Sequence, residues 1–305
     1  MVRSIWDLRG NFYQTDQFRH METKYIDPSL AKRIRRAYIE SLDLSWERFR
    51  KLKQIESMRH PYLKLSTKKA FDKKVARLRH IVEHAGLIYY EFTVKQANRF
   101  LWACLFLKRE KSTSQDDSKG MTPTGHARVE AITLHFPPHI RQDPMSIRVS
   151  AHAIDRVIQR MGLVELPIKP GDIRAVNTEI SQSLIWAAAS FFIFGKININ
   201  ESERFTLILP SQHGFFLAQF GIDPVDLTLV TYVNKDESWA EQKEAFKVLE
   251  AVKEEQLAFL AGDILARHHI QAEHSAVDDE IFRCWRDYGW RIREKIDRPK
   301  NTVVF

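Results

Sequence analysis

The sequence predicts an α+β protein: a small antiparallel sheet covered by two helices, with a basic, mainly helical N-terminal domain and a helical C-terminal segment. Three observations predict this class. One strand, two helices and three strands are grouped between residues 126 and 234, which is typical of α+β domains. Helical periodicity dominates on both sides of this stretch. Residues 1–112 carry 25 Lys and Arg against 12 Asp and Glu, whereas residues 113–305 carry 22 against 27.

The basic domain is predicted to hold two helices after an arm, residues 1–26, that shows no clear period. Asp27-Pro28 marks a helix start, because Asp is a common N-cap and Pro fits the first helical turn. His60-Pro61 ends this helix, and a second helix is predicted between Ser66 and Gly86.

The next segment, residues 87–111, is strongly apolar. It fits either a strand followed by a helix or one long helix, since periodicity does not separate the two. Residues 113–125 are rich in Ser, Thr, Asp, Gly and Pro and predict a linker. The expected domains are therefore 1–112, 126–234 and 235–305.

The middle domain opens with a predicted strand at residues 129–136, and a helix follows at 148–162, with Ser150 as N-cap and Gly162 at its end. Asp172 caps a second helix that runs to about Phe194. Three short strands then follow. They are predicted at residues 204–209, 215–220 and 226–233, and the first two are joined by a hairpin turn that contains Gly214.

The C-terminal segment, residues 235–305, is predicted to be helical. Ser238 opens a helix whose apolar stripe ends at Gly262, and a last helix is expected around residues 281–296. The stripe consists of Phe246, Leu249, Val252, Leu257 and Leu260.

The helix at 148–162 separates its side chains into an apolar and a polar side, given about 100° of rotation per residue. Its apolar side holds Ala153, Ile154, Val157, Ile158 and Met161; its polar side holds His152, Asp155, Arg156, Gln159 and Arg160. One interpretation is an amphipathic surface helix with a solvated face. The other is a site for phosphate chemistry, because His152, Arg156 and Arg160 follow one another at spacings of four residues.

Several classes of site and location are not predicted. No apolar run reaches the roughly 18–20 residues that cross a bilayer, and the N-terminus lacks the apolar core of a secretory signal, so we expect no membrane partner. Cys104 and Cys284 are widely separated, which favours a reduced, cytoplasmic protein.

No glycine-rich phosphate loop, metalloprotease motif or paired-cysteine motif occurs, so no cofactor and no metal is expected. His268, His269 and His274 lie near acidic residues. Their spacing matches no standard metal site, and they fit a solvated polar loop or an unusual metal site.

The basic domain predicts a polyanionic partner, RNA or another nucleic acid. A solubilising surface or an acidic protein partner is the alternative. The candidate nucleic-acid-binding residues are the cations of the two predicted helices: Lys32, Arg33, Arg35, Arg36, Lys68, Lys69, Lys73, Lys74 and Arg77.

Metal-independent RNA cleavage would suit the polar side of the helix at 148–162. A base takes the proton of the ribose 2′-OH, an acid protonates the leaving 5′ oxygen, and cations stabilise the charge on phosphorus. Imidazole and guanidinium groups suit these tasks. The last strand could add hydroxyls from Thr228, Thr231 or Tyr232, and the hairpin could add His213. A period of two places Thr228 and Tyr232 on one face and Thr231 on the other.

Ser150-Ala151-His152-Ala153, followed by Arg156 and Arg160, resembles the opening of small toxin domains related to RelE and BrnT, within the wider group of barnase, EndoU, colicin and RelE-like ribonucleases. The resemblance covers roughly residues 129–234, including the order helix, helix and three strands. It implies metal-free RNA cleavage. The candidate catalytic residues are His152, Arg156, Arg160, Thr231 and Tyr232.

The expected function is therefore an endoribonuclease toxin or defence effector, with an inhibitor or antitoxin as a further partner. A non-enzymatic nucleic-acid-binding or regulatory protein that acts through residues 1–112 is the alternative. A structural protein of a phage or mobile element is a third hypothesis.

Overall fold

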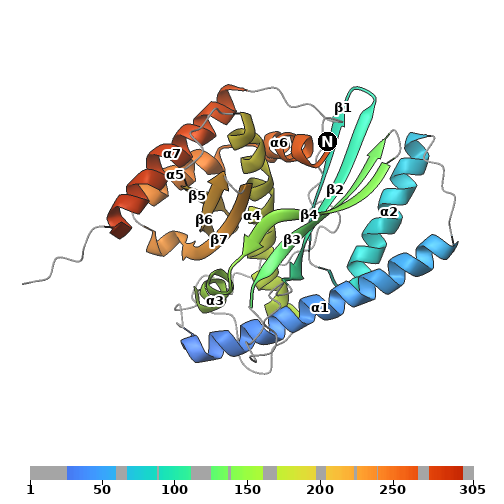
Figure 1. The fold of residues 1–305 in the computed structure, drawn as a ribbon, viewed down its shortest axis with the longest axis horizontal. Helices are drawn as coiled ribbons and strands as arrows, with labels where there is room; N and C mark the ends of the chain where they lie inside the picture. The colour runs from blue at the N-terminus through green and yellow to red at the C-terminus, as the bar shows by residue number, and fades with distance from the viewer. Residues whose placement is uncertain are drawn as a thin grey trace, which may run out of the picture.

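The structure is a computed structural model that describes residues 26–59, 67–87, 89–110, 125–136, 139–160, 170–196, 204–222, 225–238, 240–266 and 275–297. Its architecture is α+β, as the sequence predicts, and is organised around one open sheet (Figure 1). The helices are α1 (Pro28–Arg59), α2 (Lys68–Ala85), α3 (Ala151–Arg160), α4 (Pro170–Lys196), α5 (Ala240–Glu250), α6 (Glu254–Ala266) and α7 (Ala276–Asp297), with a short 3-10 turn, η4 (Lys235–Glu237).

The sheet has seven strands in the order β1-β2-β3-β4-β7-β6-β5. All neighbours are antiparallel except β4 and β7, which run parallel. Two antiparallel halves therefore meet at the β4–β7 pair, and α3 and α4 lie on the connection between them. The strands are β1 (Tyr89–Gln96), β2 (Arg99–Arg109), β3 (Ala127–Phe136), β4 (His139–Val149), β5 (Arg204–Pro210), β6 (Gly214–Ile222) and β7 (Val225–Asn234).

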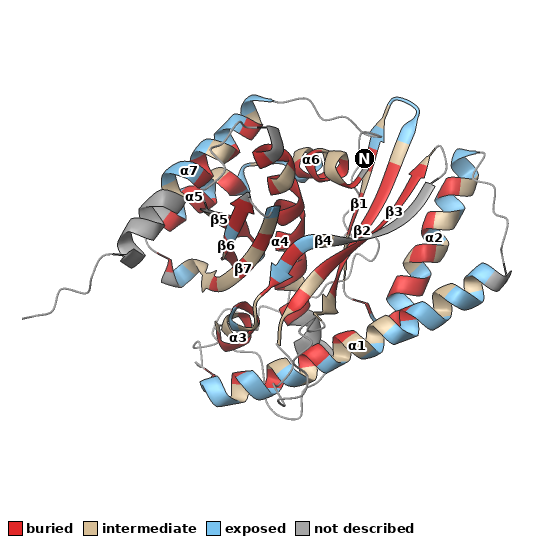
Figure 2. Cartoon of the chain, in the orientation of Figure 1, coloured by how far each residue is buried: buried red, intermediate tan, exposed pale blue. Residues whose placement is uncertain are grey.

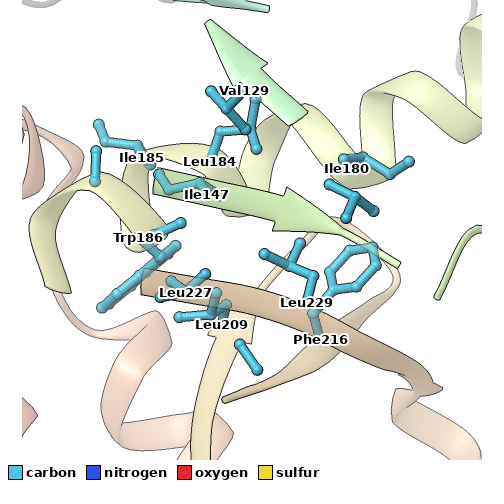
Figure 3. Close-up of a cluster of buried hydrophobic side chains, with 14 of the residues drawn as sticks. Val129, Ile147, Ile180, Leu184, Ile185, Trp186, Leu209, Phe216, Leu227 and Leu229 are labelled. Atoms are coloured by element: carbon cyan, nitrogen blue, oxygen red, sulfur yellow. The ribbon is translucent and has the colours of Figure 1, made fainter. Parts of the chain in front are cut away.

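Helices cover both faces of the first half of the sheet. Trp102, Phe106 and Leu134 face α2 and the second half of α1, where they form a separate core cluster with Phe49. The opposite face packs against α4 and α6. Figure 2 shows the resulting buried layers between the sheet and its helices. Figure 3 shows the junction of the two halves, where Leu184 and Trp186 of α4 lie among Ile147, Leu227 and their neighbours.

This two-sided burial explains why the prediction for residues 87–111 is only partly right. The strand of its first alternative is confirmed as β1, but the helix in both alternatives is wrong, because the described residues 99–109 form a second strand, β2. In β2 every residue from Leu101 to Leu107 is buried. Odd-numbered residues pack towards one layer and even-numbered residues towards the other. A strand that is buried on both faces shows no alternation of apolar and polar residues, so the sequence pattern does not reveal it.

The predicted ends of the first two helices are largely confirmed. The Asp27 carboxylate accepts the backbone N–H of Ser29 at 2.7 Å, and α1 ends at Arg59 before His60-Pro61. The N-cap of α2 is Thr67, one residue after the predicted position, and its hydroxyl accepts from the Ala70 amide. Gly86 ends α2 in the left-handed region at φ 69°, which a glycine adopts without a Cβ penalty.

The prediction that a helix begins at Arg148 is wrong, because Arg148 and Val149 end a strand, β4, that the sequence pattern missed. The helix itself is confirmed as α3, and Ser150 is its N-cap, accepting the Ala153 amide at 3.0 Å. Gly162 lies outside the described residues. The three strands after α4 are confirmed as β5, β6 and β7.

Three details of the later helices differ from the predictions. Asp172 lies inside α4, which begins at Pro170. The helix expected from Ser238 to Gly262 is two helices, α5 and α6, separated near Val252. Gly262 lies within α6, where an added Cβ would come 3.0 Å from Val94 Cγ2. The glycine therefore permits close contact between α6 and β1, and does not end the helix.

The sheet also crosses the predicted domain boundary. Most of the predicted linker, 113–125, lies outside the described residues. The strands on either side of it, β2 and β3, pair from Phe100–Phe136 to Arg109–Ala127. The basic N-terminal residues thus contribute two strands to the same sheet as the middle segment, and two helices that pack against this sheet.

Candidate active site

The helix α3 lies beside the second half of β7, where no strand of the described residues pairs with β7 on that side. Strand β4 pairs with β7 only from Leu227 to Leu229 and then turns into α3. The backbone N–H of Ser150 donates to the Leu229 carbonyl and its hydroxyl donates to the Val230 carbonyl. Arg160 donates to the Tyr232 carbonyl. Ser150, at the N-cap of α3, and the Arg160 side chain thus satisfy carbonyl groups that would otherwise lie at a strand edge.

A histidine outside α3 caps the start of this helix. The Nδ1 atom of His126 accepts the Ala151 amide at 3.2 Å. Burial lowers the pKa of His126, and Arg148 and Arg35 lower it further, against an opposing effect of Glu110. Because only a neutral imidazole can accept at Nδ1, this pKa shift favours the capping form.

The polar side of α3 carries the three predicted site residues, but in different environments. His152 is exposed, and burial, Arg156 and Arg160 lower its pKa, with Asp155 opposing. Arg156 donates to Gln159 Oε1 at 3.1 Å. Arg160 is half-buried and holds the Tyr232 carbonyl. The helix therefore offers an imidazole, whose lowered pKa favours the neutral form, beside two guanidinium groups, of which Arg160 also has a structural role.

Thr231 and Tyr232 lie on different faces, as predicted, but the prediction for Thr228 is wrong. The register between β6 and β7 shifts by one residue, so that Val230 bulges out of β7. A bulge reverses the alternation that follows it. Tyr232 consequently shares the buried face of Leu227 and Leu229, whereas Thr228 and Thr231 share the other face.

The Tyr232 side chain leads to a polar cluster that the sequence pattern did not predict. Its hydroxyl donates to Glu179 Oε2 of α4 at 3.1 Å. The Glu179 side chain is fully buried and also accepts from the Ser211 hydroxyl at 2.7 Å and the His213 amide at 3.2 Å. The His213 ring contacts Glu179 Oε1 through Nδ1 at 2.5 Å. We call these four residues, Glu179, Ser211, His213 and Tyr232, the Glu179 cluster.

Local sequence explains how the hairpin between β5 and β6 reaches this carboxylate. A Cβ on Gly214 would lie 2.3 Å from the Val233 carbonyl oxygen and 2.7 Å from the Tyr232 hydroxyl, so only glycine leaves room for the tyrosine ring. That ring also packs edge-on against Phe216, with ring centroids 5.1 Å apart. The hairpin is thereby held against α4 with the His213 side chain 58% exposed.

In the Glu179 cluster the pKa of the histidine is raised, whereas the pKa of His152 on α3 is lowered. The hydrogen bond to Glu179 raises the pKa of His213, burial and Lys235 lower it, and the Glu179 charge raises it. Burial, the Glu179 charge and the hydrogen bond to Glu179 together raise the pKa of the Tyr232 phenol, against smaller opposing effects of Ser211 and Arg160. The hydrogen bond from Arg160 to the Tyr232 carbonyl links the polar side of α3 to this cluster.

Glu179 is the principal residue that sequence reasoning missed. It lies between Val176 and Ile180 of α4, two apolar residues that are both buried. A carboxylate at such a position needs hydrogen-bond donors. That requirement is the feature of the sequence that could have pointed to Glu179. The sequence does not identify the donors, because they come from residues 32 to 53 positions away.

The predicted nucleic-acid-binding residues fall into two groups, one near the start of α1 and one on α2. Lys32, Arg33 and Arg36 are exposed near the start of α1, which packs against α3 (Figure 1). Arg35 forms an ion pair with Asp155 of α3 at 3.0 Å, and burial raises the pKa of Asp155 against opposing effects of Arg35, His152 and Lys32. Arg35 and Lys32 therefore lie near Asp155 on the polar side of α3, and Arg33 and Arg36 are exposed on the same part of α1.

The second group lies on α2, near the far end of α1. Lys68, Lys69 and Lys73 are exposed, and Lys74 is half-buried. Lys68 pairs with Asp72 at 2.9 Å, and Arg77 lies 3.4 Å from Glu56. The structure therefore does not place these residues with the first group.

Metal-binding and membrane-spanning features are absent from the part of the chain that the structure describes. Within it, no group of three or more His, Cys, Asp and Glu side chains could hold a metal ion, and His268, His269 and His274 lie outside it. None of its helices is long and apolar enough to cross a membrane. Cys104 and Cys284 are buried free thiols, and burial raises the pKa of Cys284 to about 12.

Comparisons of the chain with protein-family models, with curated proteins and with solved structures found no match.

Proposed function

We propose that this chain is a metal-independent endoribonuclease, acting as a toxin or defence effector, and that its active site lies on the polar side of α3 beside β7. The observation that carries the proposal is the exposed His152, which stands beside Arg156 and Arg160 on one side of α3 and whose pKa is lowered by partial burial and by these two charges. A histidine that is neutral near pH 7 is suited to take a proton. The resemblance of residues 150–160 to RelE- and BrnT-like domains supports the same assignment.

In this reaction His152 removes the proton of the ribose 2′-OH, which then attacks the adjacent phosphorus. Arg156 and Arg160 stabilise the charge that develops on the phosphoryl oxygens, because guanidinium groups stay protonated and match this geometry. Lys32, Arg33 and Arg36 extend the positive surface beside α3 and would hold further phosphates of the strand. Thr231 lies on the face of β7 opposite Tyr232, and Tyr232 acts through its contacts with Arg160 and Glu179.

The test measures cleavage of structured and single-stranded RNA, in the presence of EDTA, by wild type, His152→Ala and the control His84→Ala. His84 is an exposed histidine on α2. We expect wild type and the control to cleave RNA and to arrest growth on expression, with His152→Ala slower by about 10²–10⁴-fold, the usual contribution of a proton-transfer group. Equal cleavage by all three, or none by any, would overturn the proposal.

A second candidate function is nucleic-acid binding without cleavage, favoured by the exposed lysines of α2, which lie away from α3. The same RNA samples separate it from the first. Binding that weakens steeply with salt and is reduced by Lys69→Ala and Lys73→Ala, with no cleavage product, would support the second candidate.

A further inference from the structure

We propose that His213, oriented by Glu179, is the general acid of this site and gives its Nε2 proton to the 5′ oxygen that leaves during RNA cleavage. This inference rests on the proposed function, which assigns the base and the phosphate-binding groups but no acid. Glu179 is a positioning residue in this assignment, and His213 is the catalytic residue.

The geometry of the Glu179 cluster fixes which ring nitrogen faces the solvent. His213 Nδ1 is held 2.5 Å from Glu179 Oε1, and its backbone amide also donates to the same carboxylate. The ring is held at one nitrogen while 58% of the side chain is exposed. The proton that can leave for a substrate is therefore the one on Nε2. A buried carboxylate behind an exposed imidazole is the arrangement that orients a histidine for proton transfer.

Anchoring the hairpin does not by itself require a histidine. Glu179 already accepts from the Ser211 hydroxyl, the Tyr232 hydroxyl and the His213 amide. An asparagine at position 213 could add a fourth donor, but it could not change its protonation. What the histidine adds is a titratable group on the exposed side of the hairpin.

The charged groups around His213 favour its protonated form. Glu179 of α4 is the facing anion and outweighs Lys235, and Lys235 is itself paired with Glu250 of α5 at 2.7 Å. Arg160 of α3 donates to the Tyr232 carbonyl, and the Tyr232 hydroxyl donates to Glu179, so these contacts connect the polar side of α3 to the carboxylate that holds His213. His152 and His213 thus have pKa values displaced in opposite directions, which is how one site provides a base and an acid at the same pH.

The 2′ oxygen loses its proton to His152 and forms a bond to phosphorus, while the bond from phosphorus to the 5′ oxygen breaks. That oxygen takes the Nε2 proton of His213. The products are a 2′,3′-cyclic phosphate and a 5′-hydroxyl end, and proton exchange with water restores both histidines.

The leaving group distinguishes a general acid from a structural residue. Ribose 5′ oxygen leaves poorly without a proton, whereas 4-nitrophenolate leaves readily as an anion, so loss of a general acid affects only the first. The experiment measures kcat/KM for dinucleotides and for the four nucleoside 3′-(4-nitrophenyl phosphates), with wild type, His213→Asn and the control His80→Asn, an exposed histidine on α2.

We expect His213→Asn to lower kcat/KM for dinucleotides by about 10²–10⁴-fold and for the nitrophenyl esters by less than about tenfold. Equal losses on both substrates, or no loss on either, would overturn the assignment of His213 as general acid but not the proposed function. Wild type that cleaves neither substrate would overturn the proposed function as well.

A second measurement tests the role of Glu179. In an NMR titration, the Cε1–H signal of His213 should report a pKa above the ordinary value near 6.5, and Glu179→Gln should lower it. An unchanged pKa in a folded Glu179→Gln variant would contradict the positioning role of Glu179.

Discussion

Three histidines around α3 and β7 differ in what their imidazoles contact. His126 accepts a helix amide and His152 stands beside two arginines, and both have lowered pKa values. His213 contacts a buried carboxylate and has a raised pKa. The same residue type therefore supports a helix cap, a candidate base and a candidate acid, according to the groups that surround it.

The His126 cap predicts a loss of stability in mild acid. The folded protein binds a proton at His126 less readily than the unfolded chain, so stability falls as the pH drops below about 6.5, the unfolded pKa. Wild type should lose on the order of 1 kcal/mol more than His126→Asn between pH 7.5 and pH 5, the net contribution of one hydrogen bond. Urea unfolding at the two pH values measures this difference.

Asparagine suits this comparison because its side-chain oxygen can accept the Ala151 amide and does not titrate. All other titrating groups are common to both proteins and cancel in the difference. Equal acid sensitivity of the two proteins would contradict a role for the His126 cap.

At the scale of elements, close contact between α6 and the sheet depends on one glycine. An added Cβ on Gly262 would lie 3.0 Å from Val94 Cγ2 and 3.3 Å from Leu101 Cδ2. Gly262→Val should therefore destabilise the protein by about 1–3 kcal/mol, the usual cost of overpacking a core. Chemical denaturation gives the free energy of unfolding.

A double-mutant cycle supplies the control for this contact. Val94→Ala removes the methyl group that the new side chain meets, so Gly262→Val should cost less in that background than in wild type. Strictly additive costs would show that α6 does not depend on the contact between positions 262 and 94.

The same element scale shows which helices local sequence determines. Asp27, Thr67, Ser150 and Gly86 mark helix ends through hydrogen bonds or backbone conformations that involve only nearby residues. Such signals are visible in sequence. Strand β2 and the bulge at Val230 have no local signal, because burial on both faces and pairing with β6 arise only in the assembled sheet.

At the scale of the whole molecule, the pairing of β2 with β3 predicts that the chain does not divide at the expected linker. Fragments 1–112 and 126–305 should each fail to fold alone, since separation exposes the paired edges of both strands and opens the shared core. The full chain should unfold in one transition, with coincident changes in circular dichroism and tryptophan fluorescence.

Mixing the two fragments provides the positive control, because complementary fragments should restore the circular dichroism of the full chain. A stably folded 126–305 fragment with native fluorescence would instead show that the middle and C-terminal segments form an independent domain.

The sequence alone was sufficient for the α+β class, the ends of several helices and the shared polar side of His152, Arg156 and Arg160, because each follows from short-range periodicity and capping. The tertiary structure decided that one sheet joins the basic N-terminal residues to the rest. It also brought Glu179, His213 and Tyr232 together from α4, the hairpin and β7. Contacts between residues far apart in the chain depend on strand order and register, which periodicity within a segment does not specify.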